Sequence, residues 1–431
     1  MHQSSQQNTL GVDFGTSNSA AGILVNGRPH LIEIEPGLTT IPTAVFFDFA
    51  RKRTLFGNAA NAALLEGRDG RYMRSLKSVL GTSLMHEKRL MMGENLTFID
   101  IIGRFLKEIK SKAEASCGQG FDYALSGRPV HFHSSDEAKD NQALVDLKEC
   151  YLRAGFRDVK FLFEPEAAAV ANGALARKGT IGLIVDIGGG TSDFSLFKSA
   201  DRKVETAHDI KIIASHGVRV GGTNFDKCIS VDHVMPLFGK GTEIRKELGP
   251  GTHTAPNAIF QELATWEKIP FLYSRATRRD VALLHRLAQD RHLFSRLATA
   301  LELELGHDIA FAVERGKIEA NKADRNGSKI DLRAVEPQLS VAVSKEDLTQ
   351  SLDHLGLKIQ NCAMETLVMA NCPAPLVDKV IFVGGSSLMS VVGCAISEIL
   401  PNAEIAYSDA FTAIVDGLAI AASRPFADLP A

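Results

Sequence analysis

The sequence predicts an α/β fold of two lobes related by duplication, with a largely helical segment inserted in the second lobe. The main observation is a repeat. An apolar strand that ends in aspartate, followed by a Gly/Ser/Thr turn and a second apolar strand, begins near residue 10 and again near residue 181. Aligning Asp13 with Asp186 places Gly15 on Gly188. A third apolar strand at 380–383 ends in two glycines and precedes a helix-like run, and such alternation favours an α/β architecture.

The composition fits a globular protein with more than one core. A chain of 431 residues exceeds what a single compact core usually supports, and 45% apolar with 23% charged residues is ordinary. With a formal net charge of −3, the chain as a whole is not attracted electrostatically to nucleic acid or anionic lipid. The first residues show no signal-peptide pattern, and no apolar run approaches the roughly 20 residues of a membrane helix. The scattered cysteines form no Cys-x-x-Cys pair, so we expect reduced thiols and a cytoplasmic protein.

The two glycine-containing turns are suited to binding phosphate. Because Gly, Ser and Thr leave little side-chain bulk, the backbone N–H groups of such a turn can surround phosphate oxygens. Asp13 and Asp186 directly precede the turns, where a carboxylate beside phosphate requires a bridging Mg²⁺ with its waters. One such turn alone is typical of an ordinary tight turn. Two in register, together with Gly384 and Gly385 after the third strand, indicate a nucleotide site.

The hairpin sequences resemble the two phosphate motifs of the superfamily that contains actin, sugar kinases and heat-shock chaperones. They read Gly11-Val-Asp-Phe-Gly-Thr-Ser-Asn-Ser and Val185-Asp-Ile-Gly-Gly-Gly-Thr-Ser-Asp. Further segments, in order along nearly the whole chain, are similar to those of DnaK-type heat-shock chaperones: residues 73–81, 163–173, 220–226 and 313–321. The resemblance implies the two-lobed actin-like ATPase fold, with duplicated mixed sheets, helices on both faces and an inserted helical subdomain.

The same resemblance implies a domain organisation. Lobe I would comprise residues 1–177 with a subdomain inserted at about 43–119, and lobe II residues 178–403 with a mostly helical insertion at about 222–345. Residues 404–431 would return to lobe I. The interdomain linker and the peptide-binding domain of DnaK-type chaperones are not recognised, as in the short YegD-type homologues. ATP turnover is therefore better supported than the binding of polypeptides.

The resemblance also assigns roles to single residues. Lys77 and Glu164 would position the attacking water, with Thr191 beside the γ-phosphate of ATP. Asp193 would also be catalytic. Such roles agree with phosphoryl transfer, which needs charge neutralisation and an oriented water. The aspartates that would organise Mg²⁺ and monovalent cations such as K⁺ are Asp13, Asp186 and Asp193. The nucleotide-binding residues would be Gly15, Thr16, Ser17, Asn18, Gly188, Gly189, Gly190, Gly221, Gly222, Glu314, Lys317, Asn321, Gly384, Gly385, Ser386 and Leu388.

Several positions depart from the family pattern or leave alternatives open. Glu314, Lys317 and Asn321 are spaced i, i+3 and i+7, so one helix face could present them to adenosine, but a solvated face has the same spacing. Leu388 stands where the family has an arginine that stacks on adenine, which removes a cation–π interaction. The family's proline–arginine relay lacks its arginine, because Leu144 occupies the aligned position.

The sequence thus predicts a chaperone-like protein in which Mg²⁺-dependent ATP binding and hydrolysis drives opening and closing of the lobes. Its partners would be protein clients or an exchange factor, and neither nucleic acid nor membrane. A filament-forming ATPase of the actin/MreB type shares the hairpin motifs, but the short polar start of the chain cannot form an amphipathic membrane helix. A sugar or acetate kinase would need a base for the acceptor hydroxyl, and no residue is marked for that role.

Other features receive a structural interpretation. His131 and His133 would lie on one face of a strand, but no third metal ligand accompanies them. The arginine-rich stretch 275–296 could dock a partner, yet its helical spacing is typical of a solvated helix. Trp266 is expected to fill a local core.

Overall fold

The computed structural model describes residues 8–133, 136–171, 179–199, 210–322, 328–407 and 412–429. The chain forms two compact units. The first contains residues 1–219, 361–388 and 397–431, and the second contains residues 220–360 and 389–396. The expected boundary between the lobes, at residues 177 and 178, lies outside the described residues, as do Asn172 and Gly173 of the 163–173 segment. The lobe limits stay predictions.

One mixed sheet of the first unit contains both strands of the first hairpin. Its order is β11–β10–β1–β2–β3, with β4 paired to β2. β1 pairs antiparallel with β2 and parallel with β10, which is itself parallel to β11. The strands are β1 (Thr9–Phe14), β2 (Asn18–Val25), β3 (Arg28–Leu31), β4 (Thr40–Pro42), β10 (Tyr123–Arg128) and β11 (Asp158–Phe163).

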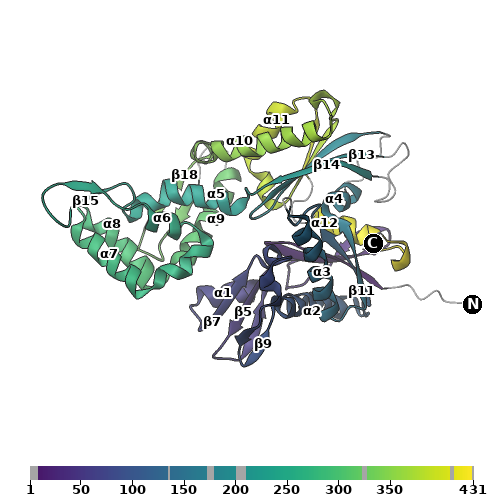
Figure 1. The fold of residues 1–431 in the computed structure, drawn as a ribbon, viewed down its shortest axis with the longest axis horizontal. Coiled ribbons are helices and arrows are strands. Elements are labelled where there is room, and N and C mark those ends of the chain that lie inside the picture. The colour runs from purple at the N-terminus through teal and green to yellow at the C-terminus, as the bar shows by residue number, and fades with distance from the viewer. Residues whose placement is uncertain are drawn as a thin grey trace, which may run out of the picture. The chain divides into compact units, whose positions relative to one another are not determined.

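A second sheet of the same unit repeats this plan around the second hairpin. Its strands are β12 (Ile181–Ile187), β13 (Ser192–Ser199), β14 (Ile210–Val218), β19 (Lys379–Val383) and β20 (Glu404–Tyr407), in the order β14–β13–β12–β19–β20. β12 pairs antiparallel with β13 and parallel with β19. Each sheet is therefore an antiparallel meander of three strands, extended beside its first strand by two parallel strands. The α/β fold and its duplication, predicted from the repeat, are confirmed (Figure 1).

Helices cover the first sheet because its strands and helices present matching apolar faces. The long helix α2 begins with a capping box between Thr97 and Asp100 and ends at Gly118, which adopts a left-handed conformation. Its apolar face joins β1 and α3 in one core that includes Phe14 and Tyr151. The smaller elements inserted after β4 include a sheet ordered β6–β5–β7. The bounds are α1 (Gly57–Leu65), α2 (Phe98–Cys117), α3 (Glu137–Arg153), β5 (Ala44–Asp48), β6 (Arg53–Phe56), β7 (Gly70–Arg74), β8 (Arg89–Met91) and β9 (Glu94–Leu96).

Two helices rich in small residues link the cores of the two sheets. α4 (Glu164–Ala171) packs closely against α12 (Ala413–Ala421). Ala167 joins the apolar cluster of β10, β11 and α12, whereas Ala168 and Ala169 join the cluster of β12, β13 and β19. Small side chains allow this close packing, and they place the start of α4 next to both hairpins.

The second unit is largely helical. Its elements are α5 (Gly222–Ile229), β15 (Glu243–Arg245), β16 (Thr252–Thr254), α6 (Ala258–Leu263), α7 (Arg275–Leu287), α8 (Arg291–Glu302), α9 (Gly306–Lys322), β17 (Ser328–Asp331) and β18 (Ser340–Val343). Trp266 packs its ring against those of His307 and Phe311, with centroids 4.5 and 5.0 Å away. Two further helices, α10 (Lys345–Met369) and α11 (Ser390–Ile399), have residues in both units. None of the described helices is long and apolar enough to cross a membrane.

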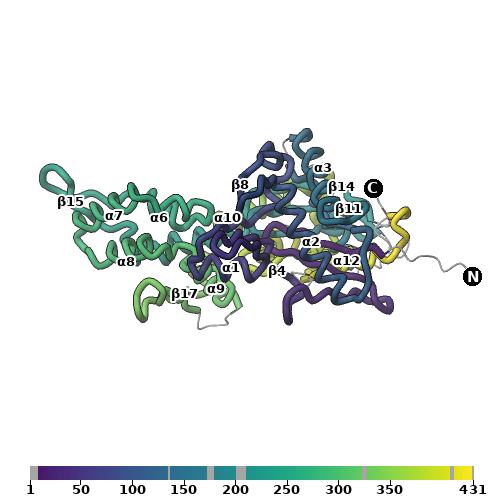
Figure 2. Tube along the Cα trace, turned by 90° about the horizontal axis from the view of Figure 1, so that it is seen from below, coloured from purple at the N-terminus to yellow at the C-terminus, as the bar shows by residue number. Residues whose placement is uncertain are grey.

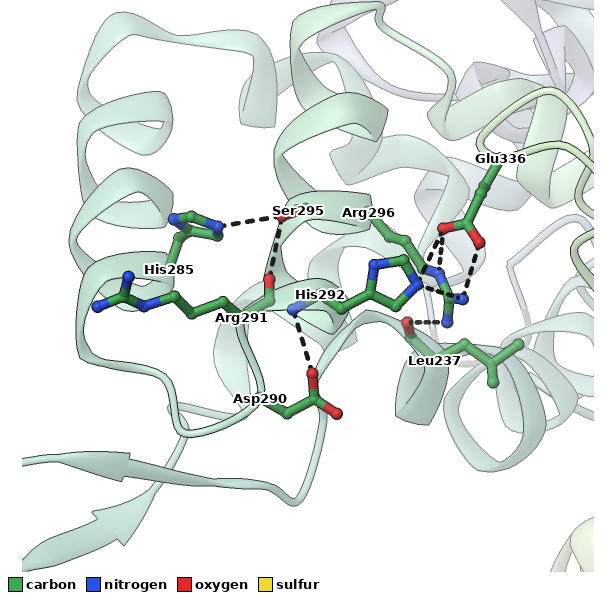
Figure 3. Close-up of polar contacts among 8 residues, drawn as sticks. All are labelled: Leu237, His285, Asp290, Arg291, His292, Ser295, Arg296 and Glu336. Carbon is green, nitrogen blue, oxygen red and sulfur yellow. Dashed lines mark hydrogen bonds and ion pairs between the residues drawn. The ribbon is translucent and has the colours of Figure 1, made fainter.

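The arginine-rich stretch 275–296 forms α7 and α8, which lie side by side (Figure 1 and Figure 2). Arg296 donates two hydrogen bonds to the carboxylate of Glu336, at 2.7 and 3.0 Å, and a third to the carbonyl of Leu237 (Figure 3). His292 lies 3.4 Å from the same carboxylate. A bidentate arginine–carboxylate pair is a strong, directional contact. Part of this stretch therefore fastens α8 to its own unit.

Candidate functional site

The first hairpin positions Asp13 beside a turn whose first residue, Gly15, has no room for a side chain. β1 and β2 pair with Asp13 opposite Ala20, so the carboxylate stands at the end of the strand next to the 15–17 turn. A Cβ on Gly15 would lie 2.2 Å from the carbonyl oxygen of Asn18, which begins β2. Only glycine fits there, and the backbone of Gly15, Thr16 and Ser17 is left accessible to a ligand.

The second hairpin repeats this geometry. Asp186 stands opposite Asp193 in the β12–β13 register, so the strands bring two carboxylates to the mouth of one turn. The turn is closed by the N–H of Gly188, which donates to the carbonyl of Thr191 at 2.9 Å. The Thr191 hydroxyl donates to Asp193 at 3.5 Å. The expected pairing of a glycine turn with aspartates is therefore present at both hairpins.

The two turns face each other within the first unit. A Cβ on Gly189 would lie 2.2 Å from Oγ of Ser17, which measures how closely the turns approach. Gly384, with φ of +82°, also passes close to the second hairpin, since a Cβ there would lie 2.9 Å from Oδ1 of Asp186. Three motifs that are far apart in sequence thus converge within the first unit.

Lys77 and Glu164 form an ion pair at the same place. Lys77 lies in a short 3₁₀ helix, Leu76–Val79, and Glu164 is the first residue of α4, directly after β11. The ammonium Nζ donates to Oε1 of Glu164 at 2.5 Å. Their side chains are only 9% and 12% exposed. The two residues expected to position a water are therefore in contact and largely shielded from solvent.

Burial and neighbouring carboxylates raise the pKa of the three aspartates in this region. Asp13, Asp186 and Asp193 are largely but not completely shielded from solvent. Burial and then the Glu164 carboxylate raise the pKa of Asp13 to about 7, although the nearby Lys77 ammonium acts to lower it. Burial and Glu164 likewise raise the pKa of Asp193 to about 7, and the pKa of Asp186 lies well above its usual range. Burial acts to lower the pKa of Lys77, but Glu164 and Asp13 outweigh it, so the pKa is raised. The ammonium stays charged.

These residues fit a divalent cation. A cation bound among carboxylates with raised pKa values would stabilise their charged forms, so such a cluster is a suitable cation site. In the part of the chain that the structure describes, no three carboxylate, imidazole or thiol groups converge closely enough to enclose a metal directly. Mg²⁺ does not require such a cluster, since it usually keeps several waters and binds protein through one or two carboxylates and substrate phosphates.

The residues predicted to bind adenosine from the helical insertion lie in the second unit and have partners there. Gly221 and Gly222 start α5. Lys317 is buried on α9, and its ammonium lies 2.7 Å from Oδ1 of Asp226 on α5. Asn321 accepts a hydrogen bond at 2.9 Å from the N–H of Ser390. Glu314, on the same helix, is partly exposed. Sequence reasoning missed Asp226, although it is the last residue of the recognised 220–226 segment.

The glycine turn after β19 places the remaining predicted residues. Gly385, Ser386 and Leu388 belong to a 3₁₀ turn, Gly385–Leu388, in the first unit. Ser387, which sequence reasoning missed, fastens this turn by donating from its hydroxyl to the carbonyl of Gly384 at 2.6 Å. Leu388 is 40% exposed. Its alignment with the family's stacking arginine stays a prediction.

The two histidines weighed as half of a metal site do not lie on a strand. β10 ends at Arg128, whose guanidinium donates to the carbonyls of Pro129 and Val130 at 3.1 and 3.2 Å. The chain leaves the sheet there, so the strand expected at His131 and His133 is wrong. The His133 ring contacts the Leu80 carbonyl instead.

Two sheets with one plan, facing glycine turns and a shielded lysine–glutamate pair define an actin-like ATPase domain. Residues 9–251, more than half of the chain, match the family described as Hsp70 protein. The chain belongs to the Hsp70 family, whose members are ATPases and chaperones. It is 29% identical over 248 residues to the chaperone protein DnaK of Thermoplasma volcanium. The match covers 56% of this chain and 38% of that relative, so this chain spans well under two thirds of its length.

Proposed function

We propose that the chain binds ATP together with Mg²⁺ at the facing turns of its first unit and hydrolyses it to ADP and phosphate. The observation that carries this proposal is the approach of Gly189 to Ser17, with Asp13, Asp186 and Asp193 directly behind the two turns. Backbone N–H groups from two sides can bind the phosphates without competing side chains. Membership of the Hsp70 family supports the choice of ATP.

The Lys77–Glu164 pair is proposed to carry the hydrolytic step. The Glu164 carboxylate would orient a water by accepting its hydrogen bond, and the Lys77 ammonium would stabilise the charge that develops on the γ-phosphate. The water oxygen bonds to the γ-phosphorus while the bond from that phosphorus to the ADP oxygen breaks, and the proton that the water loses is released to solvent. When bound, Mg²⁺ supplies charge neutralisation at the phosphates. We infer that the Thr191 hydroxyl, which donates to Asp193 at 3.5 Å, lies beside the γ-phosphate when ATP is bound.

We propose that this ATPase activity serves a chaperone-type function. The DnaK relative is a chaperone, and we propose protein clients or an exchange factor as partners and the cytoplasm as location. Coupling of turnover to movement of the lobes remains a prediction, as do the adenosine contacts. The family match disfavours the filament and kinase alternatives, and both remain open to direct test.

Thermal unfolding with and without nucleotide tests the binding step. A ligand that binds only the folded state increases the free energy of unfolding by mass action, by about 2.7 kcal/mol at a free ligand concentration of 100 Kd. The melting temperature rises as a result. We expect a clear rise with Mg·ADP, and little or none with ADP in EDTA or with Mg²⁺ alone. Asp186→Asn should abolish the rise. If saturating Mg·ADP leaves the melting curve of the parent unchanged, the nucleotide assignment is wrong.

Two further measurements separate the alternatives. Phosphate release from ATP without any added acceptor identifies an ATPase, whereas a kinase would release ADP only when its acceptor is present. Protein that sediments after ATP addition would favour a filament-forming ATPase. We expect acceptor-independent phosphate release by protein that stays in the supernatant.

A further inference from the structure

A carboxylate outside the candidate site holds the segment that carries Lys77. Asp146 lies on the inner face of α3 with its side chain 0% exposed. Its Oδ2 accepts a hydrogen bond from the backbone N–H of Gly81 at 2.9 Å. Its Oδ1 accepts one from the Gln142 amide at 2.8 Å and lies 3.2 Å from Nε2 of His86. Since a buried carboxylate is costly unless it is hydrogen-bonded, this side chain depends on these three groups.

A second contact fixes the preceding residue of the same turn. The His133 ring nitrogen Nε2 lies 2.7 Å from the carbonyl oxygen of Leu80. His133 is itself held by its N–H, which donates to the Asp140 carboxylate at 3.1 Å. The Leu80–Gly81 turn is thus fastened by one side chain from α3 and another from the segment just before it.

The turn also packs directly on α3. Gly81 has a φ of +77°, and a Cβ there would lie 2.3 Å from the carbonyl oxygen of Lys139. Leu80 is fully buried in the core of the first sheet. The turn therefore has little room to shift as long as the Asp146 and His133 contacts persist.

Lys77 is connected to this turn through its own backbone. The Leu80 N–H donates to the carbonyl of Lys77 at 3.3 Å, and one short 3₁₀ helix, Leu76–Val79, contains the lysine. A shift of the turn therefore moves the base of the Lys77 side chain. The ammonium must meet Glu164, which belongs to a different element, and a misplacement of about 1 Å from a site remote from the chemistry can cost about 10²-fold in rate.

We propose that Asp146 is a positioning residue for ATP hydrolysis, holding the Leu80–Gly81 turn so that Lys77 reaches Glu164. This inference rests on the proposed hydrolytic function, in which Lys77 acts on the γ-phosphate. Among the described residues, the hydrogen-bond and ion-pair partners of Asp146 are Gly81, Gln142 and His86, and Lys77 is not one of them. Asp146 acts only through the turn, so its loss affects the transition state more than the binding of ATP.

The first experiment compares Asp146→Ala and Asp146→Asn with the parent. In Asp146→Ala we expect kcat to fall by about 10-fold or more with little change in KM for ATP. Asp146→Asn can still accept the Gly81 N–H, so it should retain more activity than the alanine variant. The matched control is Asp100→Asn, which weakens the cap of α2 and has no described contact with the turn. Its stability should fall while its kcat stays near that of the parent.

The second experiment asks whether Asp146 acts through Lys77. In a Lys77→Ala background, adding Asp146→Ala should lower turnover no further, because Asp146 acts on turnover only by positioning the Lys77 side chain, which is already removed. Hydrogen exchange at the Gly81 amide gives a readout independent of activity, and its protection should be lost in Asp146→Ala. Should Asp146→Ala fail to fold, His133→Ala removes only the contact with Leu80 and should lower kcat with KM retained.

The outcomes distinguish this inference from the proposed function. If the parent does not hydrolyse ATP, the proposed function fails, and the inference with it. If the parent is active and Lys77→Ala is not, while the Asp146 and His133 variants keep the parental kcat, the inference alone is overturned. An equal loss from Asp146→Ala in the presence and absence of Lys77 also overturns it, because Asp146 would then act by another route.

Discussion

The ammonium of Lys77 donates to the carboxylate of Glu164 across 2.5 Å, although the two residues are 87 positions apart in the chain. The contact joins a 3₁₀ turn to the start of α4, directly after a strand of the first sheet. It puts one positive charge among carboxylates whose own pKa values are raised, and these keep the lysine protonated. A lysine fixed in this way is suited to stabilise a developing phosphate charge.

Changing Lys77→Ala is expected to abolish most ATP hydrolysis while ATP affinity changes little. An interaction made mainly in the transition state affects turnover rather than ground-state binding, and one preorganised charge is typically worth about 10²–10³ in rate. Single-turnover hydrolysis and nucleotide titration measure the two effects separately. Lys88→Ala removes an exposed lysine of the same unit and should behave like the parent. Parental hydrolysis by Lys77→Ala would require the mechanism to be withdrawn.

The hairpins could be predicted from the sequence because their signals are local. Asp13 and Asp186 each follow an apolar strand and precede a glycine turn, and the repeat of this pattern needs no knowledge of packing. The contact between Lys77 and Glu164 is different. Nothing within either segment marks the other as its partner, so only a resemblance to known proteins could pair them before the fold was known.

Other contacts could not be predicted, because a side chain's partner depends on how helices pack. The spacing of α9 placed Lys317 on a helix face but did not reveal that Asp226, on another helix, neutralises it. Nor did any local signal connect Asp146 with Gly81. The strand expected at His131 failed for a physical reason, since Arg128 binds the carbonyls that follow it and the chain leaves the sheet.

Leu388→Arg is expected to tighten ADP binding several-fold. An arginine stacked on adenine adds a cation–π interaction of about 0.5–2 kcal/mol. The position is 40% exposed, so a longer side chain can enter without disturbing the core. Calorimetric titration with Mg·ADP measures the change. The matched control is Leu376→Arg at another exposed leucine of the first unit, which should leave affinity unaltered. Unchanged or weaker binding by Leu388→Arg would show that leucine already covers the ring or that the residue lies away from adenine.

Glu166→Gln is expected to stabilise the protein above neutral pH. Burial raises the pKa of Glu166 to about 7, against a hydrogen bond from the Phe163 backbone that lowers it. The folded state therefore binds more protons than the unfolded state between about pH 4.5 and 7, and stability falls as pH rises through this window. Glutamine carries no charge and avoids this loss, which after discounting for partial exposure is on the order of 1 kcal/mol.

Melting temperatures of the parent and Glu166→Gln at pH 5 and pH 8 test this sign. The difference should be small at pH 5 and should favour the variant at pH 8. Glu87→Gln, at an exposed carboxylate, is the control and should show no such divergence. A variant that is less stable than the parent at pH 8 would mean that the Glu166 carboxylate is favoured in the folded state and that the raised pKa is wrong.

Gly417→Ala is expected to destabilise the first unit and to lower turnover at the same time. A Cβ at this position of α12 would lie 1.8 Å from the carbonyl oxygen of Ala167 on α4, and no rotamer change can move a backbone atom away. Alanine is the better helix former by about 1 kcal/mol, so any net loss of stability is steric. Overpacking of this kind typically costs about 1–3 kcal/mol. Because α4 begins at Glu164, a displaced α4 also draws the carboxylate away from Lys77.

Urea unfolding and kcat measure the loss of stability and the loss of turnover in Gly417→Ala. The control is Gly120→Ala, where the nearest atom to the new Cβ lies 3.9 Å away and where stability and turnover should stay parental. A Gly417→Ala protein with parental stability would show that α4 and α12 do not approach this closely, and the position assigned to Glu164 would then lose its structural basis.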